Sequence, residues 1–190
     1  ITAMHTKTRN GAGIPRTKEY LSLKEELDSL PSVDYERVNA EKERLLRKAF
    51  AKVCASLEDI PGYESFVKAN EGWLSPYAAF SVLRDRFGTA DFSKWGDMST
   101  FCKKKVQEYL DANKAEADYY RYVQFLLDGQ LKDAVAYAHK KGVVLKGDLP
   151  IGVSRTSVDS WSHPELFNLD SQAGAPPDAF SRDGQNWGFP

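Results

Sequence analysis

The sequence predicts a mainly helical chain that leads into one part of an α/β fold. Apolar residues recur at three- and four-residue steps along most of the chain before Gly142, which is the period of helices that bury one face. The last of these stretches is followed directly by VVLKGDLPIGV, which is rich in apolar and β-branched residues and too short for a helix. We therefore expect a block of helices and then one helix-then-strand unit.

The first helices are expected to lie between prolines. A short amphipathic helix is predicted from Lys18 to Leu30, where Pro31 ends it. Asp34 can cap the next helix, in which apolar residues recur as far as Leu57. The sequence PGY ends this second helix.

The stretch SPYAAFSVLRDRFG carries the strongest local helix signals. Ser75 is a predicted N-cap, Pro76 would occupy the first helical position, and Gly88 stands where the left-handed residue after a helix belongs. The loop FSKWGD follows, and its Trp95 is expected to be buried.

Two more helices, one strand and one helical turn complete the expected elements. The helices are predicted over residues 100–110 and 115–141, and Gly142 ends the second. A buried strand is expected to begin at Val143, and one helical turn lies near residues 157–161. A single buried strand is not a sheet, so its partners are expected outside this chain or in a partner molecule.

Composition and charge narrow the classes of function. Lys and Arg number 26 and Asp and Glu number 27, so the balanced charge gives no electrostatic support for a nucleic-acid or membrane partner. Hydrophobic residues at 42% indicate a globular protein. No apolar run reaches the length of a membrane span, and the first residues lack the apolar core of a signal peptide. We therefore expect a cytoplasmic protein.

The sequence predicts neither a cofactor nor a metal. Cys54 and Cys102 are too few for a disulfide framework or a zinc site, and both fall on predicted apolar helix faces, where we expect them to be buried and free. The chain contains no glycine-rich nucleotide motif, no GxSxG motif and no pair of histidines at metal-binding spacing.

Asp148 is the first candidate functional residue, because it lies at the carboxyl end of the predicted strand. In barrels and open α/β sheets, side chains at this end of a strand face the ligand. A cap on the following turn or a structural salt bridge is equally consistent with its position.

The closing stretch GAPPDAFSRDGQNWGFP has neither a helical nor a strand period. It combines aromatic faces with polar tips, as in Trp187 beside Gln185 and Phe180 near Asp178. Sugars present apolar C–H faces and hydroxyl edges, so this combination suits a sugar site. The alternative is that Trp187 and Phe180 only fill the core.

Several motifs in order resemble the 4-alpha-glucanotransferases, also called amylomaltases or disproportionating enzymes. The family pattern D-[LM]-P-I, S-x-[DE]-x-W, G-x-P-P-D and G-Q-x-W-G-x-P is matched by residues 148–151, 157–161, 174–178 and 184–190. The helical motif W-L-x-x-Y-A-x-F is matched by residues 73–80. The forms LKGDLPIGVSRTSVDSW and GQNWGFP are most similar to the branch of the plant cytosolic disproportionating enzyme.

The resemblance implies an α/β fold, a partial (β/α)8 TIM barrel with a large α-helical insertion. Residues 1–16 would be a tail or linker, residues 17–116 the helical insertion, and residues 117–190 a barrel segment of helix, strand and substrate loop. The segment itself would be mostly helical, and the remaining barrel strands would lie outside it.

The resemblance also implies the roles of single residues. Asp148 matches an aspartate that supports the active site, and the closing stretch matches a loop that contacts the glucan chain. The substrate-binding residues implied are Asp148, Asp178, Phe180, Ser181, Gln185 and Trp187. The substrates would be maltose, maltooligosaccharides or branched α-glucans.

The family reaction is a retaining double displacement in which an Asp attacks the anomeric carbon, a Glu protonates the leaving oxygen, and a sugar hydroxyl resolves the glycosyl-enzyme. These carboxylates belong to family motifs beyond the matched ones, so no catalytic nucleophile or acid is assigned in this chain. We expect an internal fragment of a transferase that is inactive alone. The alternative is a non-catalytic helical module that binds glucan or a partner. The oligomeric state is not predicted.

Overall fold

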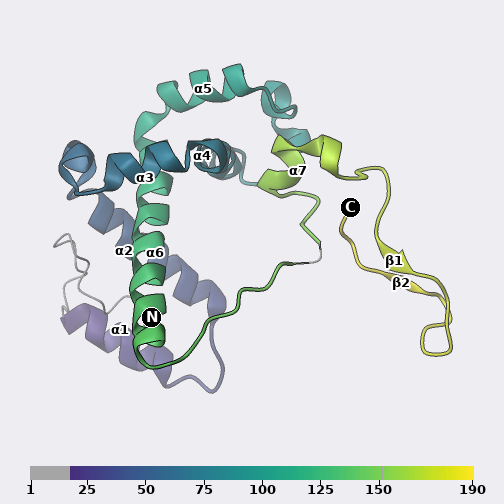
Figure 1. The fold of residues 1–190 in the computed structure, drawn as a ribbon, viewed down its shortest axis with the longest axis horizontal. Helices are drawn as coiled ribbons and strands as arrows, with labels where there is room; N and C mark the ends of the chain where they lie inside the picture. Colours follow the sequence, from purple (N-terminus) through teal and green to yellow (C-terminus); the bar gives the residue numbers. More distant parts are fainter. Residues whose placement is uncertain (1–17, 151) are drawn as a thin grey trace. The chain divides into compact units, whose positions relative to one another are not determined.

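The computed structural model describes residues 18–150 and 152–190, and this part of the chain is mostly helical (Figure 1). Its contacts divide it into two compact units. The first unit contains the described residues up to Asn70 together with residues 118–144, and the second contains residues 71–117 and 145–190.

The first unit is a group of helices around an aromatic core. Its elements are α1 (Lys18–Asp28), α2 (Tyr35–Phe50), the 3-10 helix η2 (Cys54–Asp59), α3 (Tyr63–Ala69) and most of α6 (Lys114–Lys140). Leu57, Ile60, Tyr63 and Tyr122 are buried together. The ring of Phe125 meets the rings of Tyr63 and Phe66 edge to face at 5.5 and 5.6 Å, a favoured aromatic geometry.

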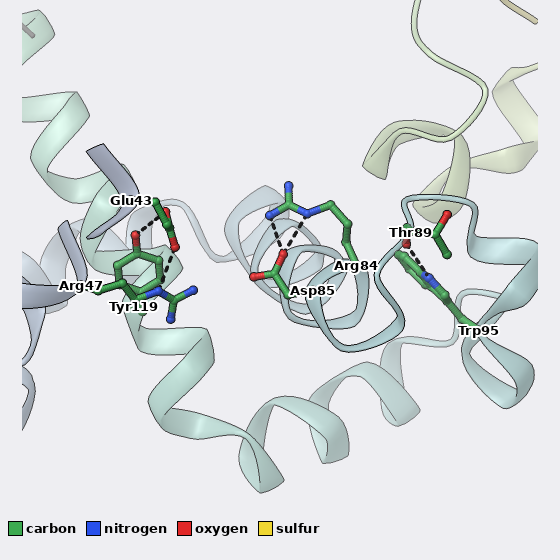
Figure 2. Close-up of polar contacts among 7 residues, drawn as sticks. All are labelled: Glu43, Arg47, Arg84, Asp85, Thr89, Trp95 and Tyr119. Carbon is green, nitrogen blue, oxygen red and sulfur yellow. Dashed lines mark hydrogen bonds and ion pairs between the residues drawn. The ribbon is translucent and has the colours of Figure 1, made fainter. Parts of the chain in front are cut away.

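A polar cluster joins α2 to α6 within this unit (Figure 2). The Tyr119 hydroxyl donates to Glu43 Oε2 at 2.8 Å, and Arg47 Nε donates to Glu43 Oε1 at 2.8 Å. The Arg47 guanidinium also lies 3.7 Å from the centre of the Tyr119 ring. Burial, and then the bond to Glu43, raise the pKa of Tyr119, so the hydroxyl stays protonated and keeps donating.

The predicted cap of α2 is confirmed, but the predicted length of this helix is wrong. Asp34 accepts a hydrogen bond from the Arg37 backbone N–H at 3.0 Å. The helix ends at Phe50, and a turn leads into η2, where the backbone at Ser56 leaves the helical region. After this bend, Leu57 packs in the same buried cluster as Tyr122.

The second unit is built around two buried tryptophans. Its elements are α4 (Glu71–Phe87), the 3-10 helices η3 (Phe92–Lys94) and η4 (Gly96–Met98), α5 (Lys103–Ala112), α7 (Val158–Ser162), η5 (Pro164–Leu166) and a hairpin described below. Trp95 and Trp161 are each 1% exposed, and their rings meet edge to face at 5.6 Å. The Trp95 indole N–H donates to the Thr89 carbonyl at 3.0 Å (Figure 2), and that of Trp161 donates to the Met98 carbonyl at 2.9 Å.

The start predicted for α4 is wrong and its end is confirmed. The helix begins at Glu71, so Pro76 lies inside it rather than at its first position. The earlier start places Leu74 on the same face as Ala78, one turn later, and both are fully buried. Gly88 has φ +65°, as predicted for the residue that ends this helix.

The end of α6 is as predicted, but the strand expected after it is absent. Gly142 has φ +73°, and Val143 donates to the Ala138 carbonyl at 2.9 Å, which closes the helix. Residues 143–150 form an extended segment with no strand pairing, and Val144 and Leu149 are 82% and 88% exposed. A strand needs a hydrogen-bonded neighbour, and no described segment supplies one here.

Both cysteines are exposed, so their predicted burial is wrong. Cys54 lies in η2 beyond the end of α2, and Cys102 is the residue before α5. Each cysteine therefore lies outside the helix face on which burial was expected.

A short hairpin follows α7, although the sequence showed no strand period there (Figure 1). Strands β1 (Gly174–Ala175) and β2 (Gln185–Asn186) pair antiparallel, with Gly174 opposite Asn186. Trp187 donates to the Ala173 carbonyl at 2.9 Å and extends this pairing. A Cβ atom on Gly174 would lie 2.1 Å from the Gln185 carbonyl oxygen, so only glycine allows this approach of the two strands.

Replacing Trp95 by alanine should lower the free energy of unfolding of the protein by about 3–5 kcal/mol, because it leaves a large cavity beside Trp161. Urea unfolding of Trp95→Ala measures this. Trp73 on α4 is 47% exposed, so the matched variant Trp73→Ala should cost about 1 kcal/mol or less. Equal losses in the two variants would contradict the packing described.

Replacing Gly174 by alanine should open the hairpin, because the added methyl group collides with the Gln185 carbonyl. Backbone amide hydrogen exchange at Trp187 should become faster, since its partner carbonyl on Ala173 moves. Gly147 has nothing within 4 Å of a built Cβ, so Gly147→Ala is the matched control and should leave this exchange unchanged. Unchanged exchange in Gly174→Ala would show that the register is wrong.

Candidate functional site

The predicted site residues lie in two segments of the second unit. Asp148 lies in the extended segment after α6, and it is exposed. Because no strand forms there, the predicted placement of Asp148 at a strand end is wrong for the described residues. The other predicted residues, from Asp178 to Trp187, all lie in or beside the hairpin.

The two aromatic residues of the predicted site present open faces. Phe180 is 98% exposed and Trp187 is half exposed, so neither fills the core of its unit. The Trp187 ring lies 6.0 Å from the Phe189 ring, centre to centre, with 32° between the planes. Flat apolar surfaces of this kind can stack on the C–H faces of a sugar ring.

Gln185 fixes the polar edge of Trp187. The two residues are two apart along an extended strand, so their side chains lie on the same face. The Trp187 indole N–H donates to Gln185 Oε1 at 2.9 Å. The Gln185 acceptor is thereby used within the hairpin, while its NH₂ group remains suited to donate to a hydroxyl.

The tip of the hairpin is held by Asp178 and Ser181, which the family resemblance implied to be substrate-binding residues. Asp178 Oδ1 accepts from the backbone N–H groups of Phe180 at 2.8 Å and Ser181 at 2.7 Å. The Ser181 hydroxyl donates to the Gly184 carbonyl at 2.6 Å. These polar groups therefore shape the loop, and the aromatic ring between them is left exposed.

Two contacts that sequence reasoning missed anchor the base of the hairpin. The Arg155 guanidinium donates to the backbone carbonyls of Leu169 and Ser171, just before β1. The ring of Phe189 lies directly over Gly152, where a Cβ would be 2.3 Å from the ring. No local pattern predicts either contact, because each joins residues far apart in the sequence.

The described residues contain no group of three or more His, Cys, Asp or Glu side chains that could hold a metal ion. In the same part of the chain, every helix is too short or too polar to cross a membrane. What the hairpin offers chemically is binding: aromatic faces, amide donors and a backbone that is already ordered.

The chain matches a family of known proteins over nearly its whole length. A family model described as 4-alpha-glucanotransferase, glycoside hydrolase family 77, matches residues 8–190. This range includes the hairpin and the extended segment with Asp148.

Individual relatives agree with this family. The chain is 45% identical over 175 residues to the 4-alpha-glucanotransferase DPE2 of Oryza sativa subsp. japonica, covering 90% of this chain and 18% of that protein. It is 34% identical over 181 residues to the 4-alpha-glucanotransferase of Chlamydia pneumoniae, covering 93% of this chain and 34% of that protein.

A solved structure is similar as well. The amylomaltase from Streptococcus agalactiae in complex with acarbose superposes with a TM-score of 0.73 and 27% sequence identity. The match covers 94% of this chain and 39% of the amylomaltase chain. The chain thus spans between about a fifth and two fifths of the length of these relatives. By its sequence match and its fold, the chain belongs to the 4-alpha-glucanotransferase family.

Proposed function

We propose that the protein containing this chain is a 4-alpha-glucanotransferase, which transfers α-1,4-glucan segments between maltooligosaccharides or larger glucans by a retaining double displacement. The observation that carries this proposal is the family match over residues 8–190, because it includes the hairpin with the exposed faces of Phe180 and Trp187. The nucleophile and the acid/base would come from parts of the protein other than this chain.

The hairpin would bind the glucan in this reaction. A transferase resolves its glycosyl-enzyme with a sugar hydroxyl rather than water, so it must hold an acceptor sugar as well as a donor. Trp187 and Phe180 supply apolar faces for sugar rings, and Gln185 supplies an amide beside Trp187. Because the loop backbone is ordered by its own hydrogen bonds, binding costs less conformational entropy.

The proposed architecture of the whole protein is a (β/α)8 barrel. Residues 17–116 would be its helical insertion and residues 117–190 a barrel segment. Two exposed apolar regions support this: the segment with Val144 and Leu149, and the face of α6 with Leu131. Exposed apolar surface of this extent is typical of surfaces that another part of the structure covers. Further strands would pair with the extended segment and bury it.

The proposed substrates are maltose, maltooligosaccharides or branched α-glucans. The amylomaltase from Streptococcus agalactiae was solved with acarbose, which is itself a carbohydrate, and this supports a site for sugar chains. The names of the rice and chlamydial relatives support transfer of glucan rather than binding alone.

The protein that carries this chain should convert maltotriose to glucose and longer maltooligosaccharides, and chromatography of the products tests this. Trp187→Ala should weaken transition-state binding by about 1–3 kcal/mol, the scale of one lost aromatic stacking partner. This corresponds to a roughly 5- to 150-fold lower kcat/KM. Tyr35 is an exposed aromatic residue of α2 outside the proposed site, so Tyr35→Ala is the matched control. Equal kinetics of Trp187→Ala and wild type would remove Trp187 from the binding site, and absence of any transfer would reject the proposed function.

Asp148 would support the active site through hydrogen bonds once the extended segment is paired in a barrel. Asp148→Asn should then lower kcat more than it raises KM, because the proposed task of Asp148 is to hold catalytic geometry. Steady-state kinetics on maltotriose measure both constants. A variant with unchanged kcat and a raised KM would instead identify Asp148 as a direct substrate ligand.

A further inference from the structure

We propose that Asp178 is a positioning residue: its carboxylate fixes the turn that presents the Phe180 ring, and the ring rather than the carboxylate contacts the glucan. This inference rests on the proposed function and refines it. It assigns separate tasks to two neighbouring residues that the sequence grouped together as substrate contacts.

The carboxylate of Asp178 is engaged by the loop itself. Two backbone N–H groups, those of Phe180 and Ser181, converge on Oδ1 at 2.8 and 2.7 Å. The backbone N–H of Asp178 also donates to the Ser181 carbonyl at 3.0 Å. Aspartate and asparagine commonly form such turns, because the side-chain oxygen takes the place of a backbone carbonyl.

The part of the turn that leads into β2 is also held by hydrogen bonds. The Ser181 hydroxyl donates to the Gly184 carbonyl at 2.6 Å, and the Gly184 N–H donates to the Ser181 carbonyl at 3.2 Å. Gly184 has φ +72°, and a Cβ there would lie 2.5 Å from the Ala175 carbonyl oxygen. The chain therefore turns back into β2 along one defined path.

Phe180 lies in the sequence between Asp178 and Gly184, whose hydrogen bonds hold the two sides of the turn. Its backbone N–H is bonded to Asp178, while its side chain is 98% exposed. An apolar ring held out from a fixed backbone is suited to stack on a sugar at low entropic cost. Both amides bond Oδ1 of Asp178, so a sugar hydroxyl at that oxygen would have to compete with them, and only Oδ2 would be left for a ligand.

A role of Asp178 in positioning the turn and a role in binding substrate would tolerate different substitutions. Asparagine keeps the Oδ1 acceptor and removes the charge, whereas alanine removes the acceptor. Asp178→Asn should therefore keep the turn, and Asp178→Ala should lose it. Asp183 is exposed in the same hairpin, so Asp183→Ala is the matched control.

The kinetic test is a double-mutant cycle in the protein that carries this chain, with maltotriose as substrate. Asp178→Ala should lower kcat/KM about five- to tenfold, mainly through KM, the scale of losing one capping acceptor. Asp178→Asn and Asp183→Ala should stay within about twofold of wild type. In a Phe180→Ala background, Asp178→Ala should cause no further loss. A full additional loss in that background would overturn the proposal, because Asp178 would then act independently of the ring.

A second measurement does not depend on activity. Amide hydrogen exchange at Phe180 and Ser181, measured without glucan, should become about five- to tenfold faster in Asp178→Ala and stay unchanged in Asp178→Asn. Unchanged exchange in Asp178→Ala would overturn the positioning role whatever the kinetics show. A wild-type protein without transfer activity would reject the proposed function, and the exchange measurement would still decide whether Asp178 holds the turn.

Discussion

The edge-to-face contact of Trp95 and Trp161 is the interaction on which the second unit depends. Each indole is buried, and each donates its N–H to a backbone carbonyl, so neither ring leaves a polar atom unsatisfied. Trp161 comes from α7, and the bond from its indole to Met98 ties α7 to the loop between α4 and α5. Arg155, just before α7, holds the carbonyls that precede the hairpin. The position of the exposed hairpin within this unit thus depends on a buried aromatic core.

Local signals in the sequence predicted the parts of the fold that local chemistry decides. Asp34 caps α2 as predicted, since a side-chain oxygen next to a free backbone N–H needs no distant partner. Gly88 and Gly142 end their helices because glycine adopts positive φ without a steric cost. Burial of Trp95 followed from its size alone. In the candidate site, the sequence identified the exposed aromatics through their motif and not through any period.

Most of the errors arose where a distant contact decides the structure. The helix α2 stops before Leu57 so that this residue packs beside Tyr122, and no neighbour in the sequence reports that contact. The segment after Gly142 has the composition of a strand but forms one only with a partner strand. The hairpin turn is a local case: Asp178 bonds backbone groups two and three residues away, and the sequence analysis did not predict these bonds. Composition identifies which groups can bond and leaves open which partner they take.

The extended segment after α6 has a consequence for self-association. An exposed run of apolar residues, such as Val144 and Leu145, offers backbone groups to any second chain and is prone to cross-β pairing. Lys146 and Asp148 interrupt this run with charge, and Pro150 removes a backbone donor. Residues of these types act as gatekeepers next to unavoidable hydrophobic strands. The same short stretch therefore combines a tendency to aggregate with the residues that oppose it.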